Sequence, residues 1–143
     1  MIWPISFHPD RQIQIGTNET NHGLLIELTS KSRSVTKKLT FAREEFRKIP
    51  IANIYNKITE NTPFPFNYIE NGPPKTTHKH LDGVYEFKTV PHRLFRIEIY
   101  TYRRHIVTCI YEYELIAEKW ELINDLELMN DELIKFEEIC EQF

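Results

Sequence analysis

Aromatic and β-branched residues alternate with polar residues between Leu81 and Tyr113, and no other stretch constrains the fold as strongly. A period of two is typical of strands that bury one face. The segment Arg103–His105 is too short for anything but a tight turn, so its flanks are expected to pair with each other. The sequence therefore predicts an antiparallel meander with strands at 84–88, 94–103 and 106–114.

In the middle strand the alternation also predicts which face is buried. Phe95, Ile97 and Ile99 would point inward, while Arg96 and Glu98 would point outward. A slip of one residue would exchange the two faces and bury the charged side chains. We therefore expect the charged face to be exposed to solvent.

The other segments predict edge strands, two short helices and a long loop. Residues 1–29 alternate in short runs, which predicts edge or hairpin strands, and residues 30–38 are polar and basic, which is typical of a loop. Apolar residues at helical spacing predict helices at 40–49 and 51–61. The proline-rich residues 62–80 predict a long loop. Together these elements predict an α+β fold, with the two short helices packed on an antiparallel sheet.

The last part of the chain predicts a long acidic helix, because its apolar residues recur at spacings of four and three. Such a helix packs on its own sheet, joins two copies of the chain, or docks on another protein. We therefore divide the chain into an α+β body at 1–114, with an N-terminal β extension, and a helix at 115–143, in the same domain or as a dimer or partner helix. The residues expected to contact a partner are Leu122, Leu126, Met129, Leu133 and Phe136.

Charge is divided unevenly along the chain, whose net charge is −3. Residues 111–143 hold eleven acidic and two basic residues, whereas residues 1–110 hold ten acidic and sixteen basic residues. An acidic tail beside a basic body is either a solvated helix face or a cover over a surface that binds nucleic acid.

Several classes of protein are excluded by composition and motifs. Two cysteines, Cys109 and Cys140, are too few for a disulfide framework, so we expect a reducing, cytoplasmic compartment. No apolar run reaches about 18 residues, so we expect no membrane contact. Phosphate-binding glycine loops and nucleophile elbows are absent from the sequence. The pair His78 and His80 has no evident third ligand nearby, so we expect no metal and no cofactor.

Basic and aromatic residues gather in and beside the predicted meander. Arginine can stabilise the charge of a phosphorane-like transition state, and aromatic rings can stack on unpaired bases. The alternative is that these are ordinary outward residues of a half-exposed sheet. The residues expected to contact nucleic acid are Lys79, Arg93, Arg103, Arg104, Lys37 and Lys38.

Two helices, a loop and two strand motifs resemble the RelE/HigB-like toxin family over about residues 40–114. Residues 81–88 read Leu-Asp-Gly-Val-Tyr-Glu-Phe-Lys where the family typically has Leu-x-Gly-Leu-Tyr-Glu-Leu-Arg, and residues 95–97 read Phe-Arg-Ile where it has Tyr-Arg-Ile/Val. The resemblance implies an mRNA endonuclease of a toxin–antitoxin system, either ribosome-dependent or acting on free mRNA. It assigns Arg96 to the transition state or a phosphate, with Lys88 in the place of the family's arginine.

Within this hypothesis, proton transfer would fall to His80, His105 or Tyr102. RNA or the ribosome would be the target, and an antitoxin-like protein would be the protein partner.

A second hypothesis is a non-enzymatic interaction protein of a phage or mobile element. After the third strand the family usually has Phe-x-Lys-Lys, whereas residues 113–116 of this chain are Tyr-Glu-Leu-Ile. The acidic helix would then bind a partner or mimic the charge of nucleic acid, and a homodimer through this helix remains open.

Overall fold

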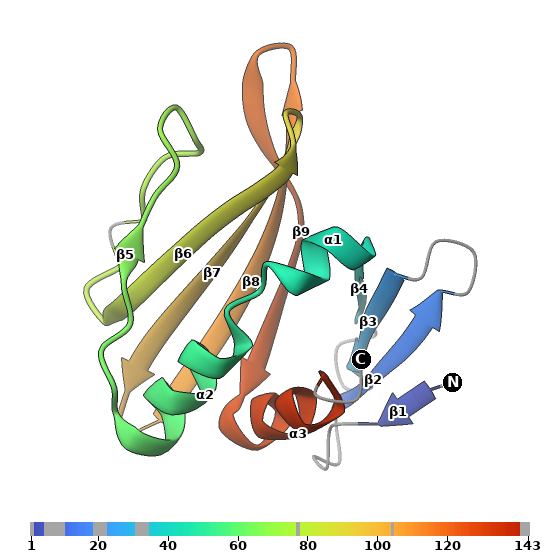
Figure 1. Ribbon diagram of the computed structural model, residues 1–143, viewed down its shortest axis with the longest axis vertical. Coiled ribbons are helices and arrows are strands. Elements are labelled where there is room, and N and C mark those ends of the chain that lie inside the picture. Colours follow the sequence, from blue (N-terminus) through green and yellow to red (C-terminus); the bar gives the residue numbers. More distant parts are fainter. Residues whose placement is uncertain are drawn as a thin grey trace.

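Two β-sheets and three helices make up the computed structural model, which describes residues 2–4, 11–18, 23–30, 35–76, 78–103 and 105–140 (Figure 1). Strand accounts for 54% of the structure and helix for 20%. The predicted α+β fold with a long acidic C-terminal helix is therefore wrong, because two segments expected as loop and helix, residues 35–41 and 119–129, pair as strands instead.

The first sheet is an antiparallel meander in the order β1-β2-β3-β4. Its members are β1 (Ile2–Pro4), β2 (Arg11–Asn18), β3 (Gly23–Ser30) and β4 (Val35–Phe41). The first three confirm the strands expected near the N-terminus.

Strand β4 corrects the prediction of a basic loop at 30–38 and of a helix that begins at Thr40. Leu39 and Phe41 are fully buried, whereas Lys38 before them and Thr40 between them are exposed, so burial alternates as in a strand. Pairing with β3 satisfies the backbone of this segment, and this tertiary pairing outweighs its polar composition.

The helices are α1 (Arg43–Arg47), α2 (Ile51–Glu60) and α3 (Asn130–Cys140). Glu45 caps the start of α1, since its Oε1 accepts a hydrogen bond of 2.8 Å from the backbone N–H of Ala42. Pro50 precedes α2, and Asn61 ends it with a left-handed φ of 55°. In Figure 1, α2 and α3 lie side by side at one end of the two sheets.

The second sheet has the order β5-β6-β7-β8-β9, with β5 parallel to β6 and all other neighbours antiparallel. The strands are β5 (Phe66–Asn67), β6 (Leu81–Val90), β7 (Arg93–Tyr102), β8 (His105–Ile116) and β9 (Lys119–Met129). Strands β6, β7 and β8 confirm the predicted meander. The first and third strands are longer than predicted, and the second begins and ends one residue earlier.

Strand β9 and helix α3 replace the predicted helix at 115–143. The β8 backbone needs a partner on its outer side, and β9 pairs with it from Ile116 opposite Lys119 to Val107 opposite Met129. Leu126 and Leu128, two residues apart, are both buried, as a strand requires. The chain becomes helical only at Asn130, where Glu132 Oε1 accepts a hydrogen bond of 2.9 Å from the N–H of Met129.

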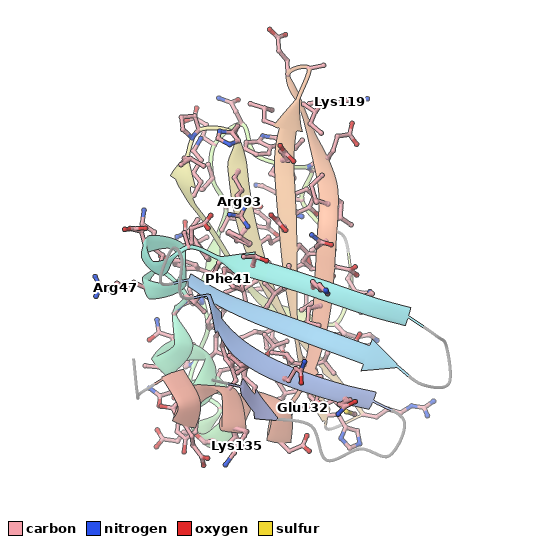
Figure 2. All side chains as sticks on the ribbon, turned by 90° about the vertical axis from the view of Figure 1, so that its right-hand side faces the viewer. Phe41, Arg47, Arg93, Lys119, Glu132 and Lys135 are labelled. Carbon is pink, nitrogen blue, oxygen red and sulfur yellow. The ribbon has the colours of Figure 1, made fainter. Side chains whose placement is uncertain are left out.

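The core lies between the two sheets and the helices. The first sheet crosses the second at a steep angle, and β4 contacts β9 (Figure 2). The buried apolar residues of this core are Ile13, Ile15, Leu39, Phe41, Ile49, Ile54, Phe64, Phe87, Phe95, Ile97, Ile99, Ile110, Leu126, Leu128, Leu133 and Phe136.

Candidate functional site

Arg96 lies in the buried centre of the second sheet and is only 2% exposed. Its Nε donates a hydrogen bond of 2.6 Å to Glu86 Oε2 on the neighbouring strand, and its Nη1 lies 4.0 Å from Glu98 Oε1. The predicted exposure of Arg96 and Glu98 is therefore wrong. Both faces of β7 are buried, one by the core and the other by the loop between β5 and β6.

We call residues 68–75 of that loop the strap. The carbonyl of Pro73 accepts a hydrogen bond of 3.1 Å from Arg96 Nη2, and Glu86 Oε1 accepts one of 2.7 Å from the N–H of Ile69. The ring of Tyr68 lies 5.8 Å from the guanidinium of Arg96. Arg96 and Glu86 thus fasten the strap to the sheet.

The segment just before β5 approaches β6 at a glycine. A Cβ on Gly83 would lie 2.5 Å from Phe64 Cδ1 and 3.0 Å from the carbonyl oxygen of Pro65. Only a residue without a side chain therefore allows residues 64–65 to approach β6, which places β5 beside that strand. An open pocket of about 410 Å³ lies within the strap and is lined by Tyr68–Lys75.

Beside Arg96, a half-buried group of tyrosines surrounds Glu98 and Cys109. The hydroxyl of Tyr100 donates a hydrogen bond to the Glu98 carboxylate. Burial raises the pKa of Glu98, Tyr100 and Tyr111 above their usual values, and burial together with the nearby Glu127 raises the pKa of Cys109 to about 12. The Cys109 thiol therefore stays protonated at neutral pH and is a poor nucleophile.

The residues predicted to be catalytic do not converge on one point. Lys88 is exposed near one end of β6, where its carbonyl accepts a hydrogen bond of 3.3 Å from Lys48 Nζ. His80 precedes the other end of β6, about 26 Å away at a rise of about 3.3 Å per residue. Arg96 lies between them under the strap. Tyr102 ends β7, and its side chain lies outside the described part of the structure.

His80 does lie beside the turn that joins β7 to β8. The N–H of Thr101 donates a hydrogen bond of 3.1 Å to the carbonyl of His80, which holds the segment before β6 against the end of β7. On the other side of β7, Tyr102 pairs with His105. Two segments about 25 residues apart in sequence therefore meet at one end of the sheet.

We call His78, Lys79, His80, Arg103 and His105 the basic end. All of them except the half-buried His80 are exposed. The N–H of His80 donates a hydrogen bond of 3.1 Å to His78 Nδ1, and the His78 ring packs edge-on at 4.6 Å from the ring of Tyr100. Arg104, also predicted to contact nucleic acid, lies outside the described residues.

Arg93 and Lys37, also predicted to contact nucleic acid, join the second sheet to α1 and β4 instead. Arg93 Nη1 donates a hydrogen bond of 2.7 Å to Glu45 Oε1, and its Nε donates one of 2.8 Å to Glu112 Oε2. Lys37 Nζ on β4 lies 3.0 Å from Asp125 Oδ1 on β9. Lys38 is exposed on β4, far along the chain from the basic end.

The residues predicted to bind a partner divide into two groups. Leu126, Leu133 and Phe136 are buried in the chain's own core, so they are not available to another protein. Leu122 and Met129 are exposed on β9. The sequence prediction missed Leu115 as a further exposed apolar residue, because a helical period was applied where the chain forms a hairpin.

Neither a protein-family model nor a curated protein matches this chain. Among the described residues, no three His, Cys, Asp or Glu side chains are grouped so that they could hold a metal ion. The same residues contain no helix of sufficient length and apolar character to span a membrane.

Proposed function

We propose that this chain binds single-stranded RNA through the phosphates, at the basic end. The observation that carries the proposal is the backbone contact between Thr101 and His80, which brings together the two segments that carry the exposed cations Lys79 and Arg103. Phosphate contacts by Lys and Arg supply most of the affinity in nucleic-acid complexes. The resemblance of residues 81–97 to a family of RNA-directed toxins favours RNA as the nucleic acid.

The histidines of the basic end favour an unpaired strand over a duplex. His78 and His105 are exposed, and an imidazole ring is one of the platforms on which unstacked bases lie. A duplex presents phosphates but no base faces. A single-stranded RNA that crosses the β7–β8 turn would therefore gain phosphate contacts as well as stacking of its bases on the histidines.

Binding is favoured over cleavage. The resemblance gave Arg96 the role of stabilising the transition state, but Glu86 and Pro73 occupy its donors and the strap covers it. A cleavage reaction would have to use His80 and His105 for proton transfer without Arg96.

The proposal is tested by fluorescence anisotropy of a labelled single-stranded RNA with the full chain. The variant Lys79→Ala/Arg103→Ala is expected to bind at least about tenfold more weakly, and its salt slope should fall by about 1.4, since each lost contact to a single strand contributes about 0.7. The matched control is Lys48→Ala/Lys88→Ala, which removes the same charge at the other end of β6 and should bind like the wild type.

An equal loss in both variants, or an absence of binding by the wild type, would contradict the proposal. The same samples, run on a denaturing gel, show whether the bound RNA is cleaved. Cleavage lost in His80→Ala and His105→Ala would add an endonuclease activity to the proposed binding.

A further inference from the structure

The β8–β9 hairpin extends beyond the rest of its sheet. The register of β7 begins with Arg93 opposite Glu114, so β8 has no β7 neighbour beyond that point. In Figure 1 this hairpin rises as the orange loop at the top of the molecule. We call residues 114–123 the arm.

Apolar side chains are exposed along the arm. A monomeric protein rarely exposes several large apolar side chains together unless they bind something. Their exposed fractions are 37% for Leu115, 49% for Ile116, 51% for Leu122 and 42% for Ile123.

The chain's own elements contact the arm as far as Leu115 and Trp120. Lys37 on β4 pairs with Asp125, which marks where the first sheet crosses β9, and Figure 2 shows Lys119 well beyond that crossing. On the other side, Trp120 Nε1 donates a hydrogen bond of 2.9 Å to the carbonyl of Asn71 in the strap. Within the described residues, β9 is the last strand of its sheet, so its outer edge along the arm pairs with no strand.

Charge decides what could cover this surface. Glu114 and Glu121 lie directly opposite each other on the two strands of the arm, an arrangement that destabilises a hairpin. Among the described residues, neither carboxylate has a cation within ion-pair distance. Glu118 in the turn adds a third exposed carboxylate, against one exposed cation, Lys119. A partner that supplies positive charge would relieve this repulsion.

We infer that the arm docks an extended segment of another protein, in which Lys or Arg side chains alternate with apolar ones. The segment adds to the outer edge of β9 as a further strand, a common mode of peptide recognition. Its apolar side chains cover Leu122 and Ile123, and its cations lie beside Glu121 and extend over β9 toward Glu114. A second copy of the arm is a poor occupant, since it would bring carboxylates against carboxylates.

The inference is independent of RNA binding and is tested with a synthetic probe. The probe is a short labelled peptide that alternates Lys with Val, and its matched control alternates Glu with Val. The full chain, labelled with ¹⁵N, is titrated with each peptide and followed by anisotropy and by amide shifts. We expect the Lys–Val peptide to bind and to shift the β9 amides and the indole N–H of Trp120, and the Glu–Val peptide to leave them unchanged.

Two variants separate docking at the arm from general attraction to an acidic protein. Glu114→Gln/Glu121→Gln is expected to bind the Lys–Val peptide at least about tenfold more weakly, because two charge-assisted contacts are lost. Glu44→Gln/Glu60→Gln removes two exposed carboxylates on the helices α1 and α2 and should bind like the wild type. Lys79→Ala/Arg103→Ala should also bind the peptide normally, which keeps this result apart from the RNA result.

Equal weakening in the two Gln variants, or binding of the Glu–Val peptide as tight as that of the Lys–Val peptide, would overturn the inference. So would concentration-dependent dimerisation that Leu122→Ser/Ile123→Ser abolishes, because the occupant would then be a second copy. The Ser variant is expected to lose peptide binding with little change in thermal unfolding, since both side chains are already exposed.

Discussion

The centre of the second sheet and its basic end use the same types of residue in opposite ways. At the centre, Arg96 is buried with Glu86 and Glu98, and its guanidinium holds the strap. At the basic end, Arg103 and Lys79 are exposed beside a turn. The position of an arginine in the sheet, and what covers it, therefore decides whether its guanidinium is buried in the fold or exposed to solvent.

The two arginines differ because removing a charge from water costs free energy. A buried arginine is tolerated only when carboxylates and carbonyls satisfy its donors, and these same contacts prevent it from binding a phosphate. An exposed residue in a turn, such as Arg103, remains hydrated.

Arg96→Ala should lower the free energy of unfolding by about 3–5 kcal/mol, since it leaves the buried Glu86 without its cation and releases the strap from one anchor. Arg103→Ala, the same change at an exposed position, should alter stability by less than about 0.5 kcal/mol. Urea denaturation of both variants measures the difference. If Arg96→Ala kept full stability and lost RNA binding instead, the contrast between centre and end would be wrong.

The turn of the arm offers a smaller, stabilising change. Ala117 and Glu118 have positive φ angles of 49° and 63°, which cost a non-glycine residue about 1 kcal/mol or more. Ala117→Asn/Glu118→Gly supplies the residues that such two-residue turns prefer and should raise the free energy of unfolding by about 1 kcal/mol. Lys119→Gly, which places glycine in the adjacent strand, should lower it. If Ala117→Asn/Glu118→Gly lowered the free energy of unfolding and Lys119→Gly raised it, the arm would have a different turn.

Glu98 should produce the smallest effect, and one that depends on pH. Burial raises the pKa of this carboxyl in the folded state above the ordinary 4.5. The stability that protonated Glu98 contributes is therefore fully present below about pH 4.5 and is lost as the pH rises through the raised pKa. Glu98→Gln cannot ionise, so its free energy of unfolding should rise relative to that of the wild type as pH increases. A difference between the two proteins that is constant with pH would contradict this account.

The meander could be predicted because its period of two extends over many residues and does not depend on distant contacts. The same pattern places the Arg103–His105 turn at the end of the sheet, and Lys79 directly precedes the first meander strand, so most of the basic end was predictable. Strand β9 was not. Its leucines and glutamates favour a helix, and only pairing with β8 makes this segment a strand.

The burial of Arg96 could not be predicted from the sequence pattern either. Alternation alone indicates that one face of β7 is polar, and a polar face normally lies toward solvent. The strap covers that face through contacts that link Ile69 to Glu86 and Pro73 to Arg96, and no local period reports such a covering loop. The proline-rich composition of residues 62–80 predicted a loop but not where it would lie.

The most direct test of the account is an NMR titration of the ¹⁵N-labelled full chain with a short single-stranded RNA. We predict that the amide shifts concentrate at residues 78–80 and 103–105, and that the strap, Arg96 and the arm keep their free-state spectra. Shifts centred on Arg96 and the strap would show that the buried centre opens to bind RNA, and shifts on the arm alone would place RNA at the acidic end. Shifts at the strap and Arg96, or at the acidic arm, would each contradict the account in which Arg96 is structural and the basic end binds the ligand.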